Sequence, residues 1–94
     1  MNLQFEWDDE KDRANRKKHG ISFETASYVF RDEYFIEMYE FEHSIDEDRY
    51  IAIGMVGDLL FVVFTERSDA IRLISARLAT ESERRLYYDQ NFYN

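Results

Sequence analysis

Four stretches rich in β-branched and aromatic residues follow one another in the second half of the chain. They are residues 34–41 (YFIEMYEF), 49–56 (RYIAIGMV), 59–66 (LLFVVFTE) and 70–76 (AIRLISA), and their composition is typical of strands. The links between them are EHSIDED, Gly57-Asp58 and Ser68-Asp69, which are too short for a crossover helix. The four strands are therefore predicted to be antiparallel neighbours. LLFVVF, apolar on both faces, predicts a central strand that is covered on each side.

A strand and a helix are predicted before this region. Residues 3–7 (LQFEW) alternate apolar and polar side chains, as a short half-buried strand does. Asp8 has the residue type of a helix N-cap and Gly20 that of a left-handed helix end, so a helix is expected over about residues 9–19. Asp12 and Arg16 have the spacing of an i,i+4 ion pair on that helix.

Two further helices are predicted from their capping residues. Ser22 begins the first of them, and its apolar positions are Phe23, Ala26, Tyr28 and Phe30. Thr80 and Glu83 have the spacing of a capping box, which begins the last helix. The element order is β-α-α-β-β-β-β-α, so the expected class is α+β: an antiparallel four- to five-stranded sheet with helices packed on it, in one domain over residues 1–94.

Charge is distributed unevenly along the chain. The formal net charge is -8, and residues 23–66 hold eleven acids against two bases. Bases gather instead at 13–19 (RANRKKH) and between 67 and 85. This balance disfavours non-specific binding to nucleic acid, but it allows a local phosphate site because distant charges are screened in salt.

Composition excludes several classes of protein. There is no cysteine, so disulfides and thiolate zinc sites are impossible, and a cytoplasmic location is expected. No signal peptide and no membrane-spanning run are expected. The three glycines match no phosphate-binding loop, and two histidines 24 positions apart favour no transition-metal site. We expect no cofactor and no metal.

The remaining chemistry depends on cationic side chains and one histidine. Such a set suits metal-free RNA cleavage by the neighbouring 2′-hydroxyl, in which a base and an acid move protons and fixed cations stabilise the charge on phosphorus. Arginine binds phosphate through two parallel hydrogen bonds, and the unperturbed pKa of histidine lies near neutrality. The candidates are Lys18, His19, Arg67, Arg72, Arg77, Arg84 and Arg85.

Each candidate also has a structural interpretation. His19 could cap helix carbonyls, and Lys18 could be an exposed partner of the helix dipole. Arg72 and Arg77 differ in strand parity, so they point to opposite faces of the sheet unless a bulge intervenes. If they do point to opposite faces, Arg72 is the one expected to have a structural role and Arg77 the one expected to bind phosphate. Arg84 and Arg85 are consecutive on one helix and point in different directions, so at most one of them can face a given site. Glu83 is explained as the capping-box partner of Thr80. Trp7 is expected in the core, although a base could stack on an open edge.

The motifs FEWDDEK…N..KHGISFE.A..VF.D (5–32), R…IG (49–54) and TER…IRLISAR.AT..ERR.Y (65–87) occur in this order. In this pattern the chain resembles the BrnT toxins of bacterial type II toxin–antitoxin systems, over about residues 5–88. The residues that match are Trp7, Lys11, Asn15, Lys18, His19, Arg67, Arg72, Arg77, Glu83 and Arg84.

The resemblance implies a RelE-like endoribonuclease that cleaves RNA without metal and arrests growth. It also implies a BrnA-type antitoxin with a ribbon-helix-helix part, so that DNA is contacted only through this partner. No contact with a membrane is expected, because the sequence has no membrane-spanning run. Carried over to this chain, the catalytic residues are Arg67 and Arg77, then His19 and Lys18. Weaker substrate-binding candidates are Trp7, Arg72 and Arg84.

A second hypothesis is an inert member that acts as a binding module in a repressor complex. Convergence of His19, Arg67 and Arg77 on one open concavity, without neutralising carboxylates, would favour the enzyme. Paired and dispersed arginines would favour the binding module. The acidic net charge fits the broader RelE-like group poorly, because ribosome-bound toxins are usually basic.

Overall fold

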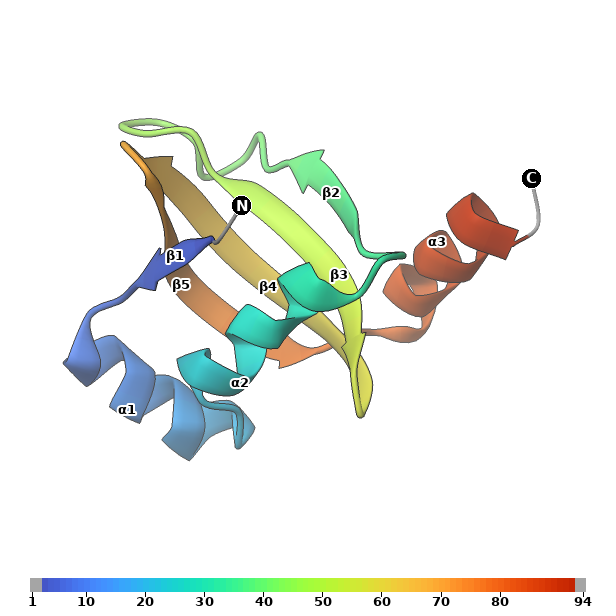
Figure 1. Cartoon of the computed structure of the whole chain (residues 1–94), viewed down its shortest axis with the longest axis horizontal. Coiled ribbons are helices and arrows are strands. Elements are labelled where there is room, and N and C mark those ends of the chain that lie inside the picture. Colours follow the sequence, from blue (N-terminus) through green and yellow to red (C-terminus); the bar gives the residue numbers. More distant parts are fainter. Residues whose placement is uncertain (1–2, 93–94) are drawn as a thin grey trace.

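A computed structural model describes residues 3–92 of the chain. Strands and helices follow the predicted order, and Figure 1 shows their arrangement. No helix in the described part of the chain is long and apolar enough to cross a bilayer. The elements are β1 (Gln4–Glu6), α1 (Asp9–His19), α2 (Phe23–Ser27), the 3-10 helix η1 (Tyr28–Arg31), β2 (Ile36–Tyr39), β3 (Tyr50–Val56), β4 (Asp58–Arg67), β5 (Ala70–Leu78) and α3 (Glu81–Phe92).

The sheet has five strands in the order β1-β5-β4-β3-β2. β2 to β5 form consecutive antiparallel pairs, and β4 lies at the centre, as its apolar sequence predicts. β1 is parallel to β5, so the sheet is mixed and the prediction of a purely antiparallel sheet is wrong in this detail. The short-link argument reaches only β2 to β5, because helices separate β1 from its neighbours in sequence.

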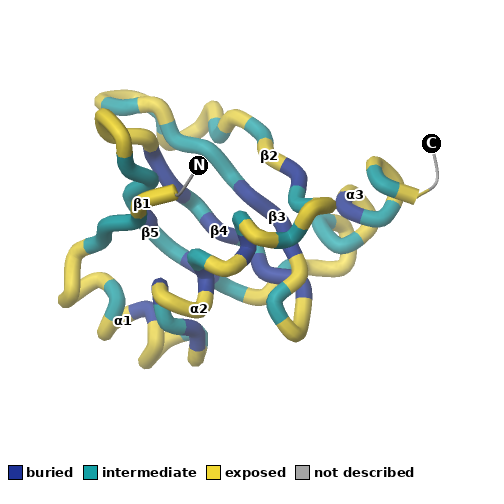
Figure 2. Tube along the Cα trace, viewed as in Figure 1, coloured by how far each residue is buried: buried dark blue, intermediate teal, exposed yellow. Residues whose placement is uncertain are grey.

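The two faces of the sheet pack against different helices. One face, with Leu60, Val62 and Leu73, shares a core with Phe23 and Ala26 of α2. The other face, with Ile53 and Leu59, packs against Tyr87 of α3. Figure 2 shows the buried stretches along β3 and β4, in contrast to the largely exposed α1. The fold is thus an α+β sheet with helices on both faces.

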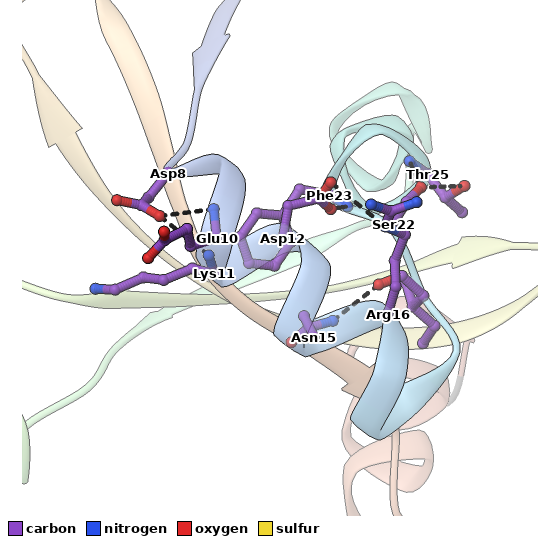
Figure 3. A network of polar contacts seen from close by, with 10 residues as sticks. Asp8, Glu10, Lys11, Asp12, Asn15, Arg16, Ser22, Phe23 and Thr25 are labelled. Carbon is purple, nitrogen blue, oxygen red and sulfur yellow. Dashed lines mark hydrogen bonds and ion pairs between the residues drawn. The ribbon is translucent and has the colours of Figure 1, made fainter.

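The predicted helix caps are present in the structure. Figure 3 shows the Asp8 carboxylate, which accepts hydrogen bonds from the backbone N–H groups of Glu10 and Lys11. Gly20 ends α1 in the left-handed conformation with φ 73°. The expected Asp12–Arg16 ion pair is present at 3.5 Å. The backbone N–H of Thr80 donates to the Glu83 carboxylate at 2.8 Å, and the backbone N–H of Glu83 donates to the Thr80 hydroxyl at 3.3 Å, as in a capping box.

Two segments differ from the sequence prediction. The second helix changes to a 3-10 turn at Tyr28, which rotates Val29 into the core and leaves Tyr28 42% exposed. The strand expected over residues 34–41 is limited to Ile36–Tyr39, and Phe41 is 83% exposed. Both differences have the same cause. The local pattern assigns Tyr28 and Phe41 to the core, but tertiary packing leaves them on the surface.

Candidate active site on the sheet

A bulge in β5 decides which way its arginines point. Ser75 lies opposite Val63, but Leu73 lies opposite Phe64, so Ile74 is an extra residue with no partner on β4. An extra residue shifts the side-chain alternation by one. This is the exception that the strand-parity argument allowed: with the bulge in place, Arg72 and Arg77 point to the same face.

Three arginines share the face of the sheet that also carries α3. Arg72 lies opposite Thr65 and Arg77 opposite Phe61, while Arg67 follows on β4 itself. Positions 61, 65 and 67 of one strand point the same way, and directly opposite residues share a face. We call this surface, defined by Arg67, Arg72 and Arg77, the arginine face.

The arginine face is long and does not form a single pocket around three cations. Arg77 lies opposite Phe61, six residues along β4 from Arg67, which is about 20 Å of strand. Arg72 and Arg67 are diagonal neighbours, about 7 Å apart between side-chain origins. The arginines are therefore spaced along an extended surface, with Arg77 at one end and Arg67 at the other.

Arg77 connects the end of β5 to the beginning of α3. Its two terminal nitrogens donate to the two carboxylate oxygens of Glu83 at 2.8 and 2.9 Å, and its guanidinium carbon lies 3.9 Å from the centre of the Phe61 ring. Hydrogen bonding to Glu83 raises the pKa of Arg77, and the same contact lowers the pKa of Glu83. Both groups are therefore charged at neutral pH. The Glu83 carboxylate thus accepts hydrogen bonds both from the backbone of Thr80, in the capping box, and from the Arg77 side chain.

The other predicted arginines are also paired with carboxylates. Arg72 donates to Glu6 on β1 at 2.8 Å, and Arg67 lies 3.4 Å from Glu47 in the β2–β3 loop. Arg84 of α3 donates to Asp58 at 2.9 Å, whereas Arg85 points elsewhere and lies 3.9 Å from Glu81. In the free chain these arginines do not present unpaired positive charge.

Lys18, His19 and Trp7 lie outside the arginine face. Lys18 and His19 belong to the last turn of α1, and their side chains form no hydrogen bond or ion pair with other residues of the described part of the chain. The side chain of Asn15 donates to the carbonyl of Ala76 at 2.8 Å. His19 lies one helical turn after Asn15, so the end of α1 is near the end of β5 that carries Arg77. Trp7 packs against Phe23 with 6.3 Å between ring centres, as a core residue does.

The structure thus does not bring His19, Arg67 and Arg77 to one point. His19 and Arg77 belong to the same end of β5, and Arg67 belongs to the other. Arg72 lies between them on the same face as the two arginines. This arrangement can contact several phosphates of one strand, but not a single phosphate from all sides.

Comparison with protein-family models matches residues 7–83 to the family described as "Ribonuclease toxin, BrnT, of type II toxin-antitoxin system". The chain belongs to the BrnT toxin family. The resemblance found in its sequence motifs is confirmed, and with it the membership of a family of ribonuclease toxins from toxin–antitoxin systems.

A solved structure supports the same fold. The crystal structure of the Brucella abortus ribonuclease toxin BrnT matches with a TM-score of 0.62 and 24% sequence identity, over 85% of this chain and 100% of that one. At this identity the likeness shows the shared fold. A comparison with curated proteins found no match.

A second group of cations near Arg67 was missed by the sequence reasoning. A cleft of about 490 Å³ beside the β2–β3 loop is lined by His43, Arg49 and Arg67 together with acidic residues. The Nε atom of Arg49 is buried without a hydrogen-bond partner, and the imidazole of His43 contacts Glu40. The arginine of the family motif R…IG was the only signal of this cleft in the sequence. Within residues 3–92, no three acidic or histidine side chains are grouped so that they could hold a metal ion.

Proposed function

We propose that this chain is the toxin of a type II module that cleaves RNA in the cytoplasm without a metal ion. A BrnA-type antitoxin, with a ribbon-helix-helix part that contacts DNA, neutralises it. Membership of a family of ribonuclease toxins carries the proposal. The bulge at Ile74 supports it by directing Arg67, Arg72 and Arg77 to the same face of the sheet, whereas their separation and their pairing with carboxylates are the features stated above to favour a binding module. A row of forked cations on one face suits the phosphates of an RNA strand.

The residues have distinct roles in this proposal. Arg77 binds the scissile phosphate and stabilises its extra negative charge in the transition state. His19, at the same end of β5, moves a proton to or from the reacting oxygens, and Lys18 adds positive charge beside it. Arg72 and Arg67 bind flanking phosphates along the strand. Trp7 and Arg84 lie outside this path, since one is packed on Phe23 and the other is paired with Asp58.

Glu83 keeps Arg77 from binding phosphate in the free chain. Its carboxylate occupies two of the donors that a phosphate would use. RNA must therefore displace Glu83 or share Arg77 with it, and a phosphate dianion or an extended RNA strand competes well because several contacts form together.

A second candidate function is a binding module without catalysis. The observation that favours it is the pairing of Arg67, Arg72, Arg77 and Arg84 with carboxylates. In that case the arginines hold the fold together, and the chain acts by occupying a partner in a repressor complex.

Cleavage of RNA by the purified chain separates the two functions. We expect wild type to cleave single-stranded RNA in the presence of EDTA and to leave a 2′,3′-cyclic phosphate. Arg77→Ala should lose at least about 100-fold in rate, which is the scale of one transition-state contact. The matched control is Arg85→Ala, an exposed arginine on α3, and it should cleave like wild type. No cleavage by wild type would favour the binding module.

The two histidines test the position of the reaction centre. His19→Gln should reduce cleavage about 100-fold or more, whereas His43→Gln should change it little. The opposite result would move the reaction centre to the cleft of Arg49 and Arg67. In cells, growth should stop only when wild type is expressed without its antitoxin.

A further inference from the structure

A cleft of about 480 Å³ opens on the sheet face opposite to the arginine face. Its floor is aromatic: Phe30 lies 5.4 Å from Phe35 and 5.0 Å from Phe64 between ring centres, both edge to face. α2 and η1 cover the other end of this sheet face and leave the end near the β4–β5 turn without a helix (Figure 1). The cleft therefore exposes apolar surface that the fold does not cover.

Three carboxylates surround this apolar floor. Glu37 comes from β2, Glu66 from the end of β4, and Asp69 from the β4–β5 turn. None of the three forms an ion pair or a side-chain hydrogen bond within residues 3–92, and no Lys, Arg or His of that part lines the cleft. This surface contrasts with the arginine face, where every named arginine has a carboxylate partner.

The acids lie close enough to affect one another. Burial raises the pKa of Glu37, and the negative charge of Glu66 raises it further. The folded chain therefore keeps two repelling carboxylates beside an apolar surface, which costs stability unless a cation arrives. Phosphate is repelled here, so nucleic acid is not the occupant.

We propose that this cleft binds a short segment of a partner protein in which an apolar side chain lies next to Lys or Arg. The apolar side chain enters between Leu3 and the aromatic floor, and the basic groups pair with Glu37, Glu66 and Asp69. Large apolar anchors surrounded by charge pairs are the usual core and rim of a protein interface. Only the identity of the partner, an antitoxin with a basic segment, rests on the proposed function.

The location of the cleft has a consequence for inhibition. The cleft and the arginine face open on opposite sides of one sheet, so a segment bound in the cleft leaves Arg67, Arg72 and Arg77 accessible. A partner that also blocks RNA must reach around the sheet with a second segment. Binding at the cleft then raises the effective concentration of that second segment.

A labelled peptide tests the proposal directly. The probe is a fluorescent peptide in which two leucines alternate with three lysines, and its control has glutamate in place of lysine. Fluorescence anisotropy should show binding of the basic peptide alone, weakened in about 0.5 M salt, where charges are screened within a few ångströms. Amide chemical shifts should change at Glu37, Glu66 and the β4–β5 turn.

Two double variants of equal charge separate the cleft from general acidity. Glu37→Gln with Glu66→Gln should weaken peptide binding by about 3- to 30-fold, since two partly exposed ion pairs are lost. Glu24→Gln with Glu33→Gln changes exposed acids elsewhere and should bind like wild type. Leu3→Ala, at a side chain 52% exposed, should weaken binding without unfolding the chain.

Three outcomes would overturn the proposal. Equal weakening by both double variants would show attraction to the whole acidic chain. Shift changes confined to other surfaces would place the peptide elsewhere. A dimer of the free chain that the Glu37 and Glu66 variant dissociates would make a second copy the occupant. The assay contains no RNA, so a failure of the ribonuclease proposal leaves this result unaffected.

Discussion

Asn15 connects three parts of the chain through one side-chain amide. It is 7% exposed, and its nitrogen donates to the carbonyls of Ile21 and Ala76 while its oxygen accepts from the N–H of Ala76. β1 pairs with β5 only as far as Arg72, so Asn15 satisfies the free edge of β5 that β1 does not reach. This explains why a polar residue occupies a buried helix position.

Asn15→Ala should lower the free energy of unfolding by about 2–4 kcal/mol, because buried backbone groups at Ala76 lose their partners. Urea denaturation at neutral pH measures the change. Arg13→Ala, on an exposed position of the same helix, is the control and should change it by less than about 0.5 kcal/mol. A loss below about 1 kcal/mol for Asn15→Ala would mean that water replaces the amide.

Glu83→Gln tests whether the Arg77–Glu83 pair restrains RNA binding. Glutamine still serves the capping box, but it removes the charge that occupies Arg77. We expect affinity for a short RNA to rise by about 2- to 10-fold while the free energy of unfolding falls by about 1 kcal/mol. Filter binding and urea denaturation measure the two effects, with Glu81→Gln in the same helix turn as the control. Unchanged RNA affinity would contradict the proposed competition.

Among single residues, the sequence predicts caps well and charge partners poorly. Asp8, Gly20, Thr80 and Glu83 act within a few positions of themselves, so local spacing is sufficient to assign them. The partner of Arg72 lies 66 positions away, on β1. Such pairs depend on strand order, which no local pattern determines.

At the level of elements, one extra residue in β5 changes the prediction of the site. The alternation in IRLISAR indicates a regular strand, yet Ile74 is unpaired and reverses the parity of every later residue. A bulge needs no special residue type, so the sequence left it open. The number and order of helices and strands were predictable because each has its own cap or period. The parallel position of β1 was not, because it depends on a contact between the two ends of the chain.

Gly54 determines how closely η1 approaches the sheet. A Cβ atom at this position would lie 2.8 Å from Val29 Cγ1 and 3.0 Å from the Val29 carbonyl oxygen. Gly54→Ala should therefore push η1 from β3 and destabilise the chain by about 1–3 kcal/mol. Thermal denaturation followed by circular dichroism measures it.

The control for this contact is Ala52→Gly on the same strand, which removes a buried methyl group without adding bulk. It should cost about 1 kcal/mol through backbone entropy and lost contacts. If Gly54→Ala is as stable as wild type, Val29 and η1 move aside without cost, and the close approach does not constrain the fold.

Over the whole molecule, the sheet separates charge into two surfaces. The cleft of Glu37, Glu66 and Asp69 lies on one side, and the arginine face lies on the other. The net charge of -8 therefore does not describe either surface. In the proposed function, an RNA strand opens the ion pairs of the arginine face, and the proposed basic partner pairs with the acids of the cleft. This separation reconciles an acidic chain with a family of ribonuclease toxins.

Acid should destabilise the whole fold through two carboxylates that connect α3 to the sheet. Burial alone would raise the pKa of Asp32, but hydrogen bonds from Met55, Tyr34 and Tyr87 outweigh it and lower the pKa. The pKa of Glu83 is lowered chiefly by Arg77. A lowered folded-state pKa gives stability that is present above the unfolded value near pH 4 and is lost as the pH falls through the folded value.

The urea midpoint should therefore fall between about pH 6 and about pH 3, and Asp32→Asn should show a smaller fall because its side chain no longer titrates. Glu37 has the opposite sign: its raised pKa makes it destabilising at neutral pH, so Glu37→Gln should raise the midpoint near pH 7 and resemble wild type at about pH 3. Asp89→Asn, an exposed acid on α3, is the control and should follow wild type at both values. An equal fall for wild type and Asp32→Asn would show that general charge repulsion, and not the anchoring of α3, governs acid unfolding.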